Sequence, residues 1–300
     1  MLKRALLVLV ALALLGAGAF WIVTMPRPLT AADLPDHEPD VENGRYMFFA
    51  GGCASCHATP GADDPFDLGG GLELKSPFGS FYVPNISPDP QDGIGGWSTL
   101  DFVNAMQRGL SPELENYYPS FPYTSYQRMR PEDVIDLKGF LDTLDPVESS
   151  VPDHDLPFPF NIRRSLGGWK LLFLDGRQFE PDPALSEEVN RGGYLVTGPG
   201  HCAECHTPRN VLGGLERSQW LVGGPSPEGE GRVPGIDVAD LDDWSQGDLA
   251  YALETGFTPT FDSLGGSMAA VIRNTAQLTA EDRNAIAAYL KSGPAQEALR

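Results

Sequence analysis

The feature that most constrains this chain is a short motif, Cys-x-x-Cys-His, that occurs twice. The two copies span residues 53–57 and 202–206, and they contain all 4 cysteines of the 300 residues. Similar residues surround both copies. The first follows Asn-Gly-Arg-Tyr at 43–46 and precedes Val-Pro-Asn-Ile at 83–86, whereas the second follows Arg-Gly-Gly-Tyr at 191–194 and precedes Val-Pro-Gly-Ile at 233–236. The chain is therefore predicted to repeat one structural unit.

Each motif offers two thiols and an imidazole to a single haem. Two cysteines one helical turn apart can form thioethers with the two vinyl groups of a porphyrin, and the next residue then lies beneath the iron. A neutral imidazole nitrogen at that position can coordinate the metal. We therefore expect two covalently bound haem c groups. The expected attachment residues and axial iron ligands are Cys53, Cys56 and His57 in the first motif, and Cys202, Cys205 and His206 in the second.

Paired cysteines also occur in redox disulfides, structural disulfides and zinc sites. None of these explains a histidine directly after the pair in both copies. A shared zinc site with four cysteine ligands would join pairs separated by nearly half the chain, unlike the short spacings of structural zinc sites. These alternatives are therefore weaker than haem attachment.

The second half contains a clear candidate for the other axial ligand of its haem. Methionine is the usual choice in electron carriers, because it raises the reduction potential. Met268 ends the stretch Gly-Gly-Ser-Met, between the middle and last helices expected in this half. A methionine ligand belongs in that loop in a cytochrome c unit. Core packing is the alternative role for Met268.

The first half departs from this pattern. Aligning the glycines that end the two middle helices places Phe121 opposite Met268 without a gap. Phenylalanine cannot ligate iron, so Met129, eight residues later, is the tentative axial ligand of the first haem. The alternatives are an open or water-bound iron, Met106, or a histidine.

Helix signals follow the same order in both halves. A serine followed three residues later by an acid begins each middle helix, and a glycine ends it. Segments rich in glycine and proline separate the helices, with few strand signals between them. We predict a mainly α fold, with two tandem cytochrome c-like helical domains after an N-terminal transmembrane helix. The residues carrying these signals are Ser98, Asp101 and Gly109, with Pro131 opening the last helix, and Ser245, Asp248 and Gly256, with Thr279.

The N-terminal segment contains Lys3 and Arg4, followed by an uncharged run over 5–25. As a helix this run reaches about 30 Å, enough to cross a bilayer core. Ala-Gly-Ala at 17–19 resembles a signal-peptide cleavage site, but the apolar run continues past it. We expect an uncleaved single-pass anchor in a bacterial inner membrane, with the haem domains in the periplasm. The predicted parts are the signal-anchor at 1–30, cytochrome c domain 1 at 38–147, a Pro-rich packed linker at 148–183 and cytochrome c domain 2 at 184–294.

The linker is too apolar for a flexible tether, and we expect it to pack against both domains. Arg163 and Arg164 are candidate partners of haem propionates, with an ordinary surface pair as the alternative. His37 and His154 are expected to be solvated, whereas His201 should lie near a haem edge. The apolar residues behind the packing prediction are Phe158, Phe160, Trp169, Leu171, Leu172 and Phe173.

The chain is strongly acidic, with a net charge of -20. This charge argues against nucleic-acid binding and against lying along an anionic membrane, so membrane contact is assigned to the N-terminal helix. Redox proteins are the expected partners, including a basic electron acceptor, because an acidic surface speeds encounter with a basic one.

The chain resembles the membrane-anchored dihaem cytochromes c, which contain tandem class I cytochrome c units. It is similar to the cytochrome subunits of bacterial periplasmic alcohol dehydrogenase-type complexes. In such subunits the position of Phe121 is often methionine, and many of them carry a third haem. The resemblance covers about 43–290 and includes Tyr-Pro-Ser-Phe-Pro-Tyr at 118–123, Phe-Pro-Phe-Asn-Ile-Arg at 158–163 and Cys-His-Thr-Pro-Arg-Asn at 205–210.

This resemblance implies a role in a periplasmic respiratory chain. Electrons would come from a dehydrogenase and pass to quinone, another cytochrome or an oxidase. The sequence has no dinucleotide fingerprint or nucleophile elbow, so an electron-transfer protein or subunit is expected rather than an independent enzyme. The main alternative is a peroxidase-like or sulfur-compound-oxidising dihaem enzyme that uses an open first haem, and the weaker one is a membrane sensor.

Overall fold

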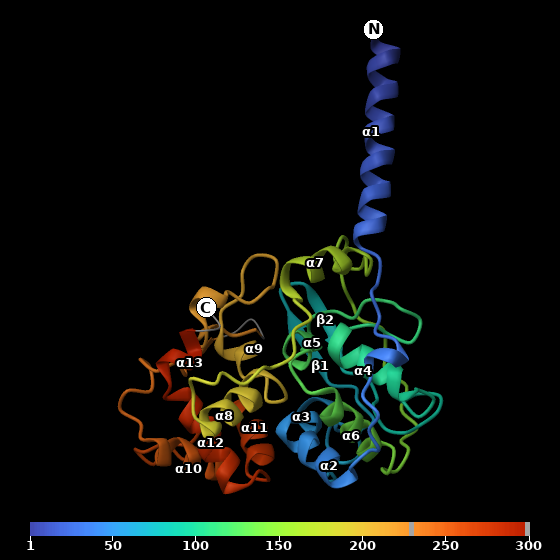
Figure 1. Cartoon of the computed structure of the whole chain (residues 1–300). Coiled ribbons are helices and arrows are strands. Elements are labelled where there is room, and N and C mark those ends of the chain that lie inside the picture. The colour runs from blue at the N-terminus through green and yellow to red at the C-terminus, as the bar shows by residue number, and fades with distance from the viewer. Residues whose placement is uncertain (228–230, 298–300) are drawn as a thin grey trace.

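The computed structural model describes residues 1–227 and 231–297. Helix α1, Leu2–Val23, projects from a body in which two helical units lie side by side (Figure 1). By length and composition α1 could cross a membrane, and a signal sequence would have the same properties. The mainly α fold with an apolar N-terminal helix is therefore confirmed.

Both units contain helices in the same order, with a short antiparallel hairpin after each motif. In the hairpin of the first unit, Glu73 pairs with Tyr82; in that of the second, Gly224 pairs with Val233. The first unit contains η1 (Ala31–Asp33), α2 (Val41–Ala50), α3 (Cys53–His57), β1 (Glu73–Ser76), β2 (Gly79–Tyr82), α4 (Thr99–Arg108), α5 (Tyr123–Tyr126) and α6 (Pro131–Leu141). After the linker helix α7 (Ser165–Phe173), the second contains α8 (Glu187–Thr197), α9 (Ala203–His206), η2 (Arg217–Gln219), β3 (Gly224–Pro225), β4 (Arg232–Val233), α10 (Gln246–Thr255), α11 (Met268–Thr275), α12 (Ala280–Leu290) and α13 (Gly293–Glu297).

The ends of the middle helices are those that the sequence predicts. The Asp101 amide donates to the Ser98 hydroxyl (3.2 Å), and the Ser98 amide donates to the Asp101 carboxylate (3.0 Å). Ser245 caps α10 in the same way. Gly109 and Gly256 end these helices in the left-handed conformation, with φ of 59° and 79°.

In each unit the helix before the motif crosses the last long helix at very short range. A Cβ placed on Gly44 of α2 would lie 2.0 Å from the Asp136 carbonyl oxygen of α6. One placed on Gly192 of α8 would lie 1.8 Å from the Ala285 carbonyl oxygen of α12. Only glycine permits this approach, which explains the glycine in the residues that precede both motifs.

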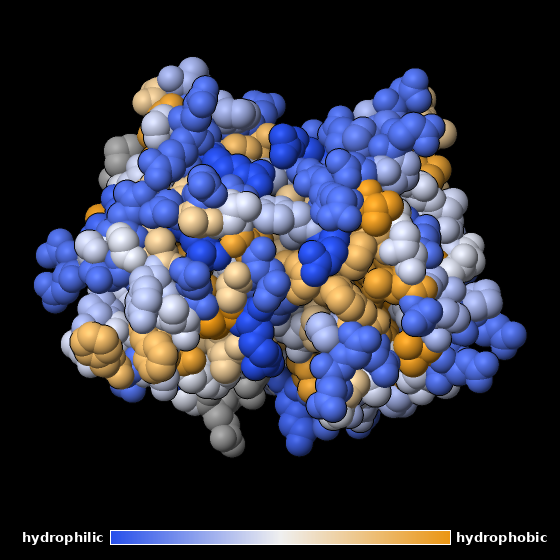
Figure 2. Space-filling view, turned by 90° about the horizontal axis from the view of Figure 1, so that it is seen from below, coloured by the Kyte–Doolittle hydropathy of each residue, from blue (hydrophilic) through white to orange (hydrophobic). Residues whose placement is uncertain are grey.

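The linker packs against both units through only some of its apolar residues. Other residues expected to pack are exposed instead: Phe158, Leu171 and Leu172. The Trp169 indole nitrogen donates to the Leu212 carbonyl of the second unit (2.8 Å), and the Trp169 ring contacts Tyr123 of the first. Phe160 packs edge-on against Phe78. On the body's face opposite α1, hydrophilic side chains cover most of the edge, and apolar ones appear nearer the middle (Figure 2).

Matching tyrosines join the two units. Tyr46 of α2 donates to the carboxylate of Asp282 in α12 (2.5 Å), and Tyr194 of α8 donates to the carboxylate of Asp133 in α6. The amides of Thr279 and Arg130 donate to these two tyrosine hydroxyls, at 3.2 and 3.3 Å. Each unit therefore supplies the same tyrosine to the start of the other unit's last long helix, as in a two-fold symmetric interface.

His37 and His154 were both expected to be solvated, but each contacts other side chains of the protein. His37 binds the Asp136 carboxylate (2.6 Å), which holds its pKa above the usual value. His154 packs between Phe81 and Tyr118, and its Nδ1 accepts the Tyr82 amide (3.2 Å). His154 is half-buried rather than fully solvated, because the strand pairing and the aromatic neighbours that partly cover it lie far away in the sequence.

Candidate haem-attachment sites

The first motif forms the short helix α3 and the turn that follows it. Gly52, with φ of 59°, turns the chain from α2 into α3, and Cys53 then lies half-buried against the first core. The Nδ1 atom of His57 lies 2.8 Å from the Pro84 carbonyl oxygen. Such a contact orients the imidazole and leaves Nε2 available for a metal. Pro84 belongs to the Val-Pro pair that recurs after each motif, so this contact explains why that pair is repeated.

The second motif has the same arrangement. The Nδ1 atom of His206 lies 2.8 Å from the Pro234 carbonyl oxygen. The carbonyls of the two histidines also have matching partners, because they accept the amides of Gly70 and Gly223 at 2.9 and 2.7 Å. The two motifs therefore position their histidines through the same local contacts.

Burial favours the neutral form of both histidines and of the first cysteine in each motif. It lowers the pKa of His57 to about 4 and also lowers that of His206, which favours the neutral imidazole that binds iron. It raises the pKa of Cys53 and of Cys202 to about 12. Two thiols followed directly by a neutral imidazole form the donor set that a covalently attached haem requires.

The loop that leads to Met268 begins at the left-handed end of α10. The Leu264 amide donates to the Gly256 carbonyl (2.8 Å), Phe257 bridges Ser263, and Phe261 has φ of 62°. Met268 then begins α11, and its side chain is partly buried.

The loop that leads to Phe121 repeats these features. The Tyr117 amide donates to the Gly109 carbonyl (2.7 Å), Leu110 bridges Asn116, and Leu114 has φ of 63°. Each of these residues aligns without a gap with its counterpart before Met268. Phe121 thus stands where the second unit has its methionine, as the sequence alignment predicts.

The Phe121 ring lies within a group of tyrosines. Its centroid is 5.9 Å from that of Tyr117, 5.6 Å from that of Tyr126 and 6.3 Å from that of Tyr123. The Tyr123 hydroxyl is buried and has no hydrogen-bond partner within the part of the chain that the structure describes. A buried hydroxyl of this kind is normally satisfied by water or by a polar atom of a ligand.

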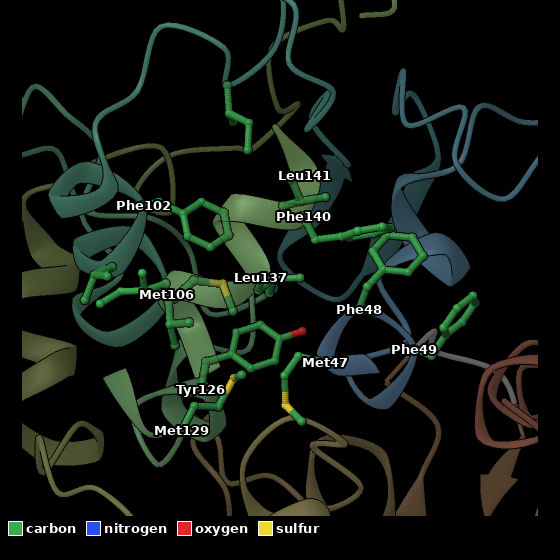
Figure 3. Packing of buried hydrophobic residues seen from close by; sticks show 14 of the residues in the cluster. Met47, Phe48, Phe49, Phe102, Met106, Tyr126, Met129, Leu137, Phe140 and Leu141 are labelled. Atoms are coloured by element: carbon green, nitrogen blue, oxygen red, sulfur yellow. The ribbon is translucent and has the colours of Figure 1, made fainter. Parts of the chain in front are cut away.

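Met129, the tentative ligand, lies in the first hydrophobic core with 1% of its surface exposed. Its carbonyl accepts a hydrogen bond from Gln107 (2.9 Å), and its Cγ lies 3.7 Å from a Cβ placed on Gly198 of the second unit. Met106 of α4 is also buried in this core. Figure 3 shows the Tyr126 ring between the side chains of Met106 and Met129. The ligand role of Met129 therefore stays a prediction.

Sequence reasoning missed a link between each motif and the other unit. Ser55 of the first motif accepts a hydrogen bond from Asn274 of α11 (2.9 Å). Glu204, which stands at the matching place in the second motif, accepts hydrogen bonds from Thr124 and Ser125 of α5, both at 2.8 Å. Asn274 comes shortly after Met268 in the sequence, and Thr124 and Ser125 come shortly after Phe121. Each motif thus binds the segment expected to cover the other haem.

Glu204 is a buried carboxylate in a fully polar setting. Its carboxylate pairs with Arg209 (2.5 Å), and 7% of its surface is exposed. Burial by itself would raise the pKa of Glu204, but the charge of Arg209 and the hydroxyls of Thr124 and Ser125 outweigh this and lower it. A charged residue between the two cysteines, followed by Arg209, was the sequence signal for this contact.

Two further residues from the sequence analysis take part in contacts between distant segments. His201 lies near the first motif, where its Nε2 is 3.2 Å from the Gly51 carbonyl oxygen and its ring packs against Tyr126. Arg164, a candidate propionate partner, instead donates to the Trp21 carbonyl at the end of α1 (2.6 Å). This arginine therefore joins the linker to the N-terminal helix.

Comparison with known proteins identifies similar chains. A family model described as cytochrome c matches residues 41–145. A protein named dihaem cytochrome c-type, from Cereibacter sphaeroides, is 52% identical over 99% of this chain and 100% of its own length. The fructose dehydrogenase cytochrome subunit of Gluconobacter japonicus is 37% identical over 91% of this chain, and the alcohol dehydrogenase (quinone) cytochrome c subunit of Gluconacetobacter polyoxogenes is 35% identical over 88%. The aligned region spans 55% and 58% of those two relatives.

Proposed function

Because this chain belongs to the dihaem c-type cytochromes, we propose that it holds two covalent haem c groups and transfers electrons in a periplasmic respiratory chain. The observation that carries this proposal is the duplicated geometry, in which His57 and His206 contact Pro84 and Pro234 at the same distance of 2.8 Å. When bound, each haem supplies one-electron exchange at its iron. The protein attaches, orients and shields the group.

The site residues keep the roles that the sequence gives them. Cys53 and Cys56 attach the first haem, and Cys202 and Cys205 attach the second. His57 and His206 are the proximal ligands, whose orientation the proline carbonyls fix. The distal ligands are Met268 for the second haem and, tentatively, Met129 for the first. The hydrogen bonds of Ser55 and Glu204 with the opposite units support transfer between the haems, because they hold the two units together.

The electron donor is a dehydrogenase, and the acceptor is quinone, another cytochrome or an oxidase. The names of the relatives support this assignment, since those from Gluconobacter japonicus and Gluconacetobacter polyoxogenes are cytochrome subunits of dehydrogenases. The net charge of -20 favours a basic surface on the acceptor.

Helix α1 anchors the protein in a bacterial inner membrane and leaves both haem units in the periplasm. Its length and apolar composition, and the basic pair Lys3 and Arg4 at its cytoplasmic end, support this orientation. The units extend over 38–147 and 184–294, joined by the packed linker at 148–183.

The test is to count haem against protein in the purified full chain, and to record its reduced optical spectrum before and after adding carbon monoxide. Two haems per chain and an unchanged spectrum support an electron carrier with both irons six-coordinate, and point to Met129 as the partner of the first. A single haem per chain would contradict the proposal.

A second candidate function is small-ligand chemistry at the first haem, as in a peroxidase-like or sulfur-compound-oxidising enzyme. The observation that favours it is Phe121, which stands in the loop place of Met268 and offers no ligand atom. This candidate predicts that carbon monoxide changes the spectrum of about half the haem, because only the first iron has an open position.

A further inference from the structure

Exposed apolar side chains gather on the linker and on the loop at 210–214. Val211 is 93% exposed, Phe158 79% and Leu172 68%, which are high values for large apolar residues of a folded domain. Contiguous exposed apolar surface of this kind usually marks an interaction site. We call it the linker apolar surface, and it consists of Phe158, Phe160, Leu171, Leu172, Val211 and Leu212.

Contacts beneath these side chains hold the surface together. The Trp169 indole of α7 donates to the Leu212 carbonyl, and a Cβ placed on Gly214 would lie 2.2 Å from the Phe173 ring. On the other side, Phe160 packs against Phe78, which also lies next to Gly213. The linker and the loop therefore form one structural element.

The same element is fixed to the end of α1. The Arg164 guanidinium donates to the Trp21 carbonyl (2.6 Å) and to the Thr24 hydroxyl (3.1 Å), and it lies over the Trp21 ring at 4.2 Å. A Cβ on Gly167 would lie 2.5 Å from the Thr24 carbonyl oxygen. Figure 1 shows α7 at the foot of α1. Tryptophan and arginine at the end of an apolar helix are typical of a membrane–water interface.

The middle of the linker differs in charge from the linker as a whole, which has four basic and six acidic residues over 148–183. Residues 156–174 contain Arg163, Arg164 and Lys170 and no aspartate or glutamate, although the chain has a net charge of -20. The Lys170 ammonium donates to the Arg108 and Gly109 carbonyls. Arg163 and Arg164 are therefore the basic side chains beside the apolar ones, a combination that fits a surface of anionic lipid. Net charge alone argued against such contact, but this part of the protein has the opposite sign.

We propose that the linker apolar surface rests on the periplasmic leaflet of the membrane that α1 enters, and so holds both haem units in one orientation. This proposal rests on the anchoring role of α1 given above. In that orientation the mainly hydrophilic edge of the opposite face points away from the membrane and is accessible to redox partners (Figure 2).

The experiment uses the full oxidised chain in oriented bilayers that contain anionic lipid, and measures the haem electron paramagnetic resonance signals against the tilt of the sample. A fixed orientation gives signals that change with tilt. The double variant Leu171→Asp, Leu172→Asp and the single variant Val211→Asp are expected to lose this dependence. Tyr251→Asp is the matched control, because Tyr251 is 50% exposed on α10, far from α1, and it should keep the wild-type dependence.

Signals that do not change with tilt in the wild type, or that change equally in all variants, would overturn the proposal. So would tilt dependence that appears only after a dehydrogenase is added, since a protein would then cover the surface. Sedimentation with vesicles tests the anchor separately, and the haem count tests the proposed function. A chain that sediments with two haems but has no fixed tilt refutes the linker surface alone.

Discussion

The two haem units share their proximal architecture and differ on the opposite side. In both, a capped middle helix ends at a left-handed glycine, and a histidine contacts a proline carbonyl at 2.8 Å. The loops that follow match residue for residue, yet one leads to Phe121 and the other to Met268. The backbone of such a unit therefore does not require a thioether at this place. The two loops differ in side-chain chemistry at this position, although their backbones match.

Exchanging these two side chains is expected to have the largest effect on the comparison. Met268→Phe removes the proposed ligand of the second haem, so about one more haem per chain should bind carbon monoxide than in the wild type. Phe121→Met should close the first iron and raise its potential if that iron is open, and should leave both unchanged if Met129 already binds it. The measurements are carbon monoxide difference spectra and redox titration.

Met47→Leu is the control for this exchange, because it changes a buried methionine of α2 that is not among the candidate ligands and should leave the spectra as they are. Met129→Leu should open the first iron if Met129 is its ligand. A Met268→Phe variant that stays inert to carbon monoxide would remove Met268 from the list of ligands.

The glycine at each helix crossing should give the next largest effect. Alanine at Gly44 or at Gly192 would place its Cβ 2.0 or 1.8 Å from a backbone carbonyl oxygen of the facing helix, so the two helices must move apart. Overpacking of this kind costs about 1–3 kcal/mol. Both variants should therefore have a lower unfolding temperature than the wild type. Gly265→Ala is the control, since a Cβ there has no atom within 4 Å, and a similar loss for it would contradict the steric explanation.

The links between the motifs and the opposite unit should differ in strength. Glu204→Gln removes a buried charge that pairs with Arg209 and accepts two hydroxyl hydrogen bonds, and we expect a loss of about 1–3 kcal/mol. Ser55→Ala removes one hydrogen bond from Asn274 and should cost about 0.5–1.5 kcal/mol. Denaturant unfolding of both variants tests this order. Equal losses of unfolding free energy would show that the buried carboxylate contributes no more than the serine hydroxyl does.

Local patterns made much of this fold predictable. The serine–acid caps at Ser98 and Ser245, the helix-ending glycines and the histidine-containing motifs depend on residues a few positions apart, and they can be read directly. The contacts of Glu204 with Thr124 and of Tyr46 with Asp282 depend on how two units dock over long sequence separations. No periodicity encodes such docking. The partial burial of His154 was missed for the same reason.

The smallest expected effect is a pH dependence of stability. It arises at a position of the last long helix where the two units have different residues. Asp136 of α6 accepts a hydrogen bond from His37, whereas the corresponding residue of α12 is Ala285. The contact raises the pKa of His37 above 6.5, so its stabilisation is complete at pH values below 6.5 and is lost as pH rises through the higher pKa of the folded state. His37→Ala should therefore lower the unfolding temperature at pH 5.5 more than at pH 8.5. Because the His37 side chain is 29% exposed, the difference should be small, and an equal loss at both pH values would mean that the histidine charge contributes nothing.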